Sequence, residues 1–272
     1  MNLTVFGRGP TGGPGPITPR VKLNGLERLG LAAMTLKLCA QLYLAILIGR
    51  AQFDLPAFAA ALRQAGLSVL PALSLVAAAV GIILGQQAAQ TLGWVNLPEL
   101  VLVPIIYAVV VELTPLLVGV LVAGRAGVAL ATRQASLVSS GQIDGLLVSG
   151  LNPIQFTTGA VLPAMLAMSF ALTVWGSLVA LGAALLWLAV VADVPLYLFQ
   201  EALRQALDPL DLLEALSKPL LFAVVIALIA TANGSAAGRD ASGVGQAATD
   251  TMIAAVTAIL LIDLAFVLAP WS

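Results

Sequence analysis

The sequence predicts an all-α integral membrane protein. Of its 272 residues, 60% are hydrophobic and only 9% are Asp, Glu, Lys or Arg, whereas a soluble domain carries about 25% charged residues. Several segments also contain the roughly 20 consecutive, mostly apolar residues that a helix needs to cross a bilayer. The bilayer is therefore the expected solvent for most of the chain.

The N-terminal segment has a different composition. Residues 1–22 are rich in Gly and Pro and cannot bury enough apolar area to fold. They also lack the continuous apolar run of a cleaved signal peptide. We expect residues 1–22 to form a flexible cytoplasmic tail and residues 23–272 to form one membrane domain.

Residues 24–50 allow two placements. The run from Leu29 to Gly49 is long enough to span, but Lys37 would then lie at its centre, which costs about 2.5–3.5 kcal/mol on insertion scales. Lys37 and Gln41 share one helix face. We favour an N-terminal interfacial (elbow) helix, with a full span as the alternative.

Five later segments have the length and hydropathy of transmembrane helices. The third is longer than one crossing requires, so a tilt, a kink near Trp175 and Gly176, or a continuation beyond the membrane remain open. The five segments are residues 66–88, 98–124, 159–191, 218–236 and 250–270.

The basic residues predict the orientation, because cytoplasmic loops are enriched in Lys and Arg. They cluster before the first confident span, in a predicted loop over 125–158 and in a second loop over 237–249. The segment 192–217, expected to form a short helix, has five acidic residues and one Arg. We therefore place the N-terminus and the two basic loops in the cytoplasm, and the acidic segment and the C-terminus on the other side.

Two acidic residues fall inside predicted spans. Glu112 lies well within the second span, where a carboxylate must face a cavity, a partner group or another subunit. Pro115 removes a helix hydrogen bond and is expected to kink the span beside it. Asp263 lies nearer the end of the last span and is expected to reach the interface or pair with a neighbouring span. A structural hydrogen-bonding role is the alternative for both acids.

The predicted cytoplasmic loops contain a short amphipathic helix and glycine-rich turns. QIDGLLVSG has an apolar side formed by Ile143, Leu146 and Leu147, and Gly150 and Pro153 are expected to end it. GSAAGRDASGVGQAATD resembles a dinucleotide fingerprint in spacing only, because no strand precedes it. A glycine-rich turn leading into a packed helix is the better interpretation. The pairs Gly81/Gly85 and Ala123/Gly127 are typical of close helix packing.

Two stretches together resemble the MlaE/YrbE-type permeases of lipid-transporting ABC systems. VVELTPLLVGVLVAGRAGVALATRQASLVSSGQIDGLLVSGLNP is similar to the family signature "RELGP … AGRxGSAxAAELGxMxxTEQIDALxxMGxDP", and GVGQAATDTMIAA is similar to "GVGxATTxxVV". The resemblance covers about residues 24–268. It implies an all-α fold with an interfacial helix, five spans and a cytoplasmic coupling helix.

The resemblance also implies roles for particular residues. Those matching the lipid pathway or gate are Glu112, Leu113 and Pro115. Those matching the segment that couples to the ATPase are Arg125, Gln142, Ile143, Asp144, Gly150 and Pro153. Those matching the second family motif are Gly243, Gly245, Ala248 and Thr249.

The chain departs from the family pattern near these positions. Val111 replaces the Arg before Glu112, so we expect Glu112 to lack a neighbouring cation. Thr114 replaces a Gly. Gly141 and Asn152 replace acids in the loop that faces the ATPase, which puts the strength of coupling in question.

The function implied by the resemblance is a permease subunit that moves phospholipid or a related amphiphile between the inner membrane and a periplasmic lipid-binding protein. Its implied partners are a cytoplasmic ABC ATPase, a periplasmic MCE-type protein, phospholipid and a second copy of the chain. We expect no catalytic residue, metal site, cofactor or nucleic-acid partner.

Other classes of function explain the sequence less well. A Ser/His protease is excluded because the chain has no histidine. A di-aspartyl protease needs two facing aspartates, and Asp263 is the one Asp well inside a span. A selective ion channel is hard to build from so few charges in the spans. A non-transporting scaffold or a degenerate permease remains the alternative, although a scaffold needs no coupling motif.

Overall fold

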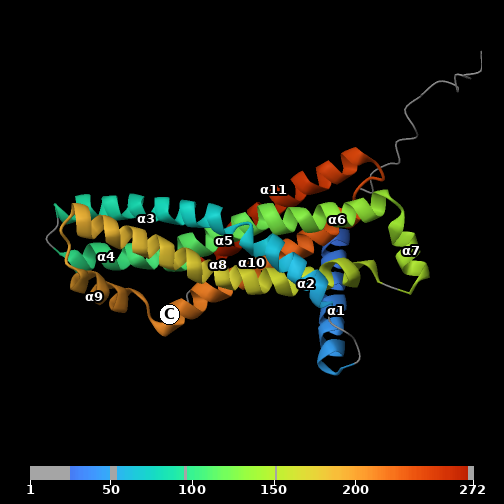
Figure 1. The fold of residues 1–272 in the computed structure, drawn as a ribbon, viewed down its shortest axis with the longest axis horizontal. Helices are drawn as coiled ribbons and strands as arrows, with labels where there is room; N and C mark the ends of the chain where they lie inside the picture. Colours follow the sequence, from blue (N-terminus) through green and yellow to red (C-terminus); the bar gives the residue numbers. More distant parts are fainter. Residues whose placement is uncertain (1–24, 50–53, 95–96, 151, 269–272) are drawn as a thin grey trace, which may run out of the picture.

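The protein is a bundle of long helices, seen here in a computed structural model. The structure describes residues 25–49, 54–94, 97–150 and 152–268, and it assigns no strand within these ranges. The tail predicted for residues 1–22 lies outside them. Figure 1 shows the long helices side by side, with α7 at one end of the bundle and α9 at the other.

The helices follow one another with short connections. They are α1 (Gly25–Leu47), α2 (Leu55–Leu62), α3 (Leu70–Leu92), α4 (Pro98–Tyr107), α5 (Thr114–Val122), α6 (Val128–Ser139), α7 (Gln142–Val148), α8 (Pro153–Val191), α9 (Leu196–Ala206), α10 (Pro209–Ser235) and α11 (Ala241–Leu268). Three wider π-helical segments lie between some of them: η1 (Arg63–Leu67), η2 (Ala108–Leu113) and η3 (Ala123–Gly127). The segments η2 and η3 join their neighbours without a break, whereas Ser68 and Val69 form a turn between η1 and α3.

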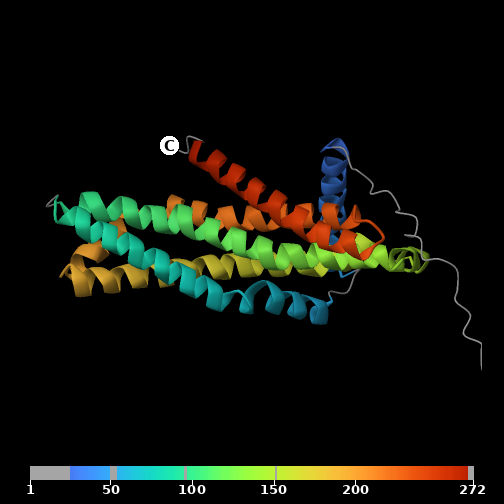
Figure 2. The same cartoon turned by 90° about the horizontal axis from the view of Figure 1, so that it is seen from above.

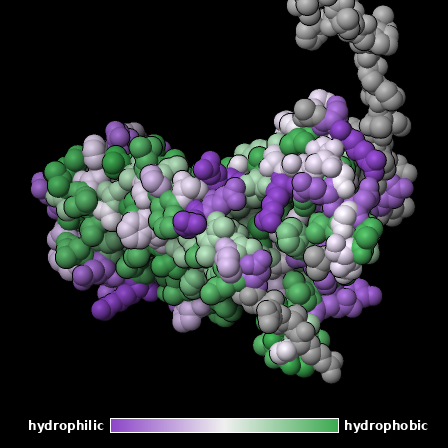
Figure 3. Space-filling model, turned by 45° about the vertical axis from the view of Figure 1, so that its right-hand side comes forward, coloured by the Kyte–Doolittle hydropathy of each residue, from purple (hydrophilic) through white to green (hydrophobic). Residues whose placement is uncertain are grey.

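The predicted all-α membrane fold is confirmed, and each of the five predicted spans lies on a helix long enough to cross a bilayer. Six described helical stretches are long and apolar enough to cross a membrane: Gly30–Leu47, Leu55–Leu92, Pro98–Ser139, Pro153–Val191, Pro209–Ser235 and Ser242–Leu268. The last five contain or overlap the five predicted segments. Figure 3 shows broad hydrophobic areas on the face drawn, as expected for a surface in contact with lipid.

The first helix differs from the others in direction. Figures 1 and 2 show α1 crossing the bundle, whereas the remaining long helices run along it. Tyr43 donates a hydrogen bond to the Gly159 carbonyl of α8 over 3.1 Å. Pro163 has no N–H to offer that carbonyl, so Tyr43 satisfies an acceptor that the helix itself leaves open. This crossed packing supports the interfacial placement of α1, although its length also permits a span.

Several predicted loops are helical, which corrects their boundaries. The expected loop over 125–158 is wrong over most of its length, because helix continues through η3 and α6 to Ser139 and resumes at Pro153. The cause is that Ala and Gln favour helix, so that Arg125 and Arg133 lie on a helix and do not mark a loop. Residues 241–249, also expected in a loop, form the start of α11.

The acidic segment 192–217 is not a single short helix either. It comprises α9 and the first turns of α10. The Asp208 side chain accepts from the N3 backbone N–H, and the Asp211 carboxylate accepts from the Asp208 N–H over 3.0 Å. Pro209 lies at the first helical position. This capping box starts α10 well before its apolar run. α8 has no break at Gly176; it begins at Pro153, before the predicted span, and ends with it at Val191.

Helix packing relies on small residues, as predicted. Gly81 and Gly85 of α3 lie directly against the α8 backbone at Ala180 and Ala184. The Ala123/Gly127 pair is buried, and a Cβ on Gly127 would meet Ile226 of α10 at 2.5 Å. The main core lies between α3, α5, α8, α10 and α11, around Val118, Phe222 and Ile259. Toward its C-terminal end, α11 diverges from the bundle (Figure 2).

Candidate functional site

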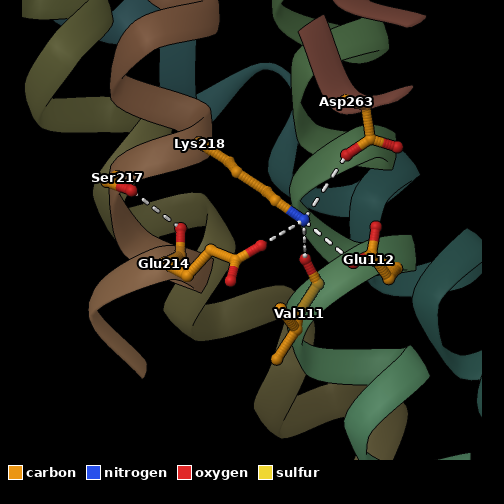
Figure 4. A network of polar contacts seen from close by, with 6 residues as sticks. All are labelled: Val111, Glu112, Glu214, Ser217, Lys218 and Asp263. Carbon is orange, nitrogen blue, oxygen red and sulfur yellow. Dashed lines mark hydrogen bonds and ion pairs between the residues drawn. The ribbon is translucent and has the colours of Figure 1, made fainter. Parts of the chain in front are cut away.

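A buried lysine lies at the centre of the candidate site. Lys218 extends from α10, and its side chain is 0% exposed. Its Nζ lies 2.9 Å from Glu112 Oε1, 2.9 Å from Glu214 Oε1 and 3.7 Å from Asp263 Oδ1. Figure 4 shows the three carboxylates converging on the ammonium from η2, α10 and α11. A buried charge without a partner of opposite sign destabilises a protein, so the Lys218 ammonium and the three carboxylates stabilise one another.

Pro115 explains why the Lys218 ammonium also contacts a backbone carbonyl. In a regular helix the Val111 carbonyl would accept from residue 115, but Pro115 has no N–H. Lys218 Nζ donates to this carbonyl over 3.2 Å. The helix widens just before Pro115 into η2, and Thr114 Oγ1 donates to the Val109 carbonyl over 2.7 Å. The predicted distortion beside Glu112 is therefore a π-helical segment, a feature frequent at functional sites.

The carboxylates are more open than the lysine. The Glu112, Glu214 and Asp263 side chains are 27%, 19% and 17% exposed, respectively. Asp263 Oδ1 is itself buried and has no hydrogen-bond partner within the described chain, and its 3.7 Å ion pair is the longest of the three. The aromatic ring of Phe266 lies 5.5 Å from Lys218 Nζ. The cluster is thus closed around the cation and partly open at the acids.

The expectation that Glu112 lacks a cation is wrong. Val111 replaces the Arg of the family pattern, but Lys218 supplies the positive charge from another helix. The prediction that Asp263 pairs with a neighbouring span is confirmed by its contact with Lys218. Sequence reasoning overlooked Lys218 and Glu214, although an i,i+4 Glu–Lys pair followed by Pro219 at the edge of an apolar run was a usable signal. Leu113 lies half-buried beside Glu112.

A second group of predicted residues lies just beyond the C-terminal end of the long helix that contains Glu112. From Glu112 to Ser139 the chain is helical throughout, a length of about 40 Å. Gly141, with φ of 70°, then turns the chain into α7. Gly150, with φ of 74°, ends α7 as predicted. Pro153 is the first residue of α8, where the Asn152 side chain accepts from the Ile154 N–H. Asn152 thus keeps a helix-capping role despite the lost charge.

The exposed surface of α7 is partly apolar. Gln142 and Asp144 are exposed and Ile143 is half-buried. Leu147 and Val148 are 58% and 90% exposed. Apolar side chains on a helix that projects from the end of the bundle (Figure 1) are typical of a protein contact.

The structure does not bring Arg125 to α7. Arg125 lies in η3, separated from the end of α6 by about 20 Å of helix. Its Nε donates to Ser68 Oγ over 3.2 Å, just beyond the end of η1. Arg125 therefore links two π-helical segments of neighbouring helices.

The residues of the second family motif occupy the start of α11. A Cβ on Gly243 would lie 2.6 Å from the Gly238 carbonyl oxygen, so glycine permits the tight turn before the helix. Gly245 and Thr249 are exposed, and Ala248 is half-buried. The turn predicted to lead into a packed helix is confirmed. The described residues contain no group of acids, Cys and His suited to hold a metal ion.

Comparisons with known proteins agree with this architecture. A family model described as "Permease MlaE" matches residues 58–269, which is most of the chain. The chain is 29% identical over 153 residues to Protein TRIGALACTOSYLDIACYLGLYCEROL 1, chloroplastic, of Arabidopsis thaliana, a match covering 56% of this chain and 43% of the relative. The chain therefore matches less than half the length of that relative.

Two further relatives are named as permeases. The chain is 25% identical over 189 residues to a probable ABC transporter permease protein of Pyropia yezoensis, covering 70% of this chain and 72% of the relative. It is 24% identical over 197 residues to a probable ABC transporter permease protein of Rickettsia prowazekii, covering 72% of this chain and 76% of the relative.

Proposed function

The chain belongs to the MlaE permease family, and on that basis we propose that it moves a phospholipid or related amphiphile between the bacterial inner membrane and a periplasmic MCE-type lipid-binding protein. It is a multi-pass ABC transporter permease, which implies an ATPase partner. The observation that carries the proposal is the ion cluster of Lys218, Glu112, Glu214 and Asp263 between the long apolar helices of the bundle.

The partial exposure of the three carboxylate side chains supports a homodimer with a polar cavity. Partly exposed carboxylates at membrane depth are not tolerated against lipid tails, because unsolvated charge is expensive there. The face of the bundle that carries Glu112 and Asp263 must therefore border water or a second protein copy. A second copy with its own cluster would enclose a cavity in which acyl chains meet apolar walls and a head group meets Glu112.

The proposed mechanism is conformational and breaks no bond in the lipid. The ATPase binds α7 and closes on ATP. The helix from Pro98 to Ser139 carries both Glu112 and the connection to α7, so a displacement of α7 reaches the ion cluster through a single continuous element. The π-helical segments η2 and η3 are the places where this element can bend. Arg125 acts within the bundle, by holding η3 against the end of η1.

The charge distribution supports the proposed orientation. Arg133 lies in α6, which leads to α7, and Arg239 lies between α10 and α11. Glu99 lies in the first turn of α4 and Glu201 lies in α9. Figure 1 shows α7 and α9 at opposite ends of the bundle. Cytoplasmic segments are enriched in Arg and Lys. The α7 end is therefore assigned to the cytoplasm and the α9 end to the periplasm.

Glu112→Gln is expected to reduce lipid transfer about tenfold, because a hydrogen bond to a charged group contributes about 1.5–3 kcal/mol. The measurement is transfer of a labelled phospholipid between proteoliposomes containing the complete transporter and the purified lipid-binding protein. Glu99→Gln, an exposed position on α4, is the control and is expected to transfer lipid normally. Unchanged transfer by Glu112→Gln at equal protein level would contradict the assigned role.

Replacing Leu147 and Val148 together with Ser is expected to remove most of the ATPase from the purified complex. Both side chains are exposed on α7, so their loss removes apolar contact area without opening a cavity in the bundle. The measurement is ATPase stoichiometry after purification in mild detergent. Ser140→Ala, exposed in the turn before α7, is the control. Full retention of the ATPase by the double variant would show that α7 is not the docking element.

A further inference from the structure

A small groove between α2 and α6 lies far from the ion cluster. It has a volume of about 200 Å³, and its walls are mainly alanines of α2, η3 and α6, with Val161 of α8 at one side. Pockets that enclose a whole drug-sized ligand measure about 300–1,000 Å³. The groove therefore has room for part of a ligand, with the remainder outside. Arg133 is separated from Glu112 by about 30 Å of helix.

The polar groups of the groove are Gln64 and Arg133, and no acid lines it. The Arg133 guanidinium lies 5.6 Å from the ring centre of Phe156, and among the described residues it forms no ion pair. Arg63 and Arg125 are also exposed on the adjoining segments η1 and η3. This combination of an exposed guanidinium, further positive charge nearby and a groove lined by methyl groups is complementary to an anion attached to a hydrocarbon chain.

The position of the groove along the helices is consistent with a location at the membrane–water interface. Arg63 and Gln64 lie in η1, and the 23 residues of α3 beyond it are by themselves long enough to cross a bilayer. Arg133 lies two turns before the end of α6. Basic pockets between transmembrane helices on the cytoplasmic side are suited to anionic lipid head groups. A head group at this depth would leave its acyl chains alongside the exposed apolar surface of the bundle.

We infer that the α2–α6 groove binds an anionic phospholipid of the cytoplasmic leaflet, with Arg133 contacting the phosphodiester and the alanine walls contacting the start of one acyl chain. This lipid is a resident of the bundle surface and is separate from the transported molecule. Its binding requires neither the ATPase nor transport; the assignment to the cytoplasmic leaflet alone rests on the orientation proposed above.

The test uses the full chain, purified in detergent and stripped of lipid, and titrated with phosphatidylglycerol, phosphatidylcholine or inorganic phosphate. Bound lipid is counted by native mass spectrometry and affinity is taken from the rise in unfolding temperature. Phosphatidylglycerol is expected to bind the unaltered chain at least tenfold more tightly than phosphatidylcholine does. Arg133→Gln is expected to weaken phosphatidylglycerol binding about tenfold, since it removes a charge-assisted hydrogen bond.

Two matched pairs of variants distinguish binding in the groove from a general effect of lost charge or added bulk. Arg204→Gln changes an exposed arginine of α9 at the other end of the bundle and is expected to bind normally. Ala60→Leu fills the groove without changing charge and is expected to weaken binding, whereas Ala79→Leu on an exposed face of α3 is not. Equal affinity of Arg133→Gln and the unaltered chain would overturn the inference. So would an equal response to inorganic phosphate, or a change of oligomeric state in Ala60→Leu with unaltered lipid affinity.

Discussion

Lys218→Met is expected to lower the free energy of unfolding by about 3–5 kcal/mol, the cost of removing one partner from a buried ion pair. The variant leaves three carboxylates converging on a site with no cation, and it also leaves the Val111 carbonyl without the donor that replaces the missing N–H of Pro115. The measurement is unfolding of the detergent-solubilised chain by a denaturing detergent, followed by circular dichroism.

The matched control is Lys37→Met, the same substitution at an exposed lysine of α1. Surface changes of this kind usually stay within about 0.5 kcal/mol, so a comparable loss in both variants would refute the structural role of Lys218. Adding Glu112→Gln and Glu214→Gln to Lys218→Met is expected to recover part of the lost stability. A further loss on adding them would show that unpaired negative charge is not the cause.

Gly81→Ala is expected to destabilise the protein by about 3 kcal/mol, at the upper end of the usual cost of overpacking. A methyl group at Gly81 would overlap the carbonyl oxygen of Ala180 and lie 2.9 Å from its carbonyl carbon. Because the obstacle is backbone, no side-chain rotation relieves it, and α3 and α8 have to move apart. The measurement is the same unfolding titration, together with the yield of folded protein.

Two other glycines are expected to show smaller losses of stability, or none, when they are replaced by alanine. Gly85→Ala places its methyl group 3.1 Å from the Ala184 carbonyl oxygen and is expected to cost less. Gly182→Ala on α8 meets nothing within 4 Å and is expected to be neutral or to stabilise by up to about 1 kcal/mol, since Ala favours helix over Gly. If all three variants behave alike, close approach of α3 and α8 is not what selects glycine at position 81.

Local patterns in the sequence predicted the features that depend on neighbouring residues. The length of each apolar run relative to the bilayer determined the fold class and the spans. Gly150 after an amphipathic stretch predicted the end of α7, because a left-handed backbone favours glycine. The Gly81/Gly85 spacing predicted a close helix contact. Glu112 was recognised as exceptional because a carboxylate inside a span is always costly.

Other features depended on which helices lie together. Lys218 and Glu112 are 106 positions apart in the chain, and no periodicity in either helix indicates that the two side chains meet. Arg125 and Arg133 suggested a loop, but packing of η3 and α6 against α10 and α11 keeps that stretch helical. The sequence by itself determined a membrane bundle containing a rare acid. Only the tertiary structure decided which cation pairs with that acid, because a buried charge must be neutralised by whatever group the fold brings within reach, wherever that group lies along the chain.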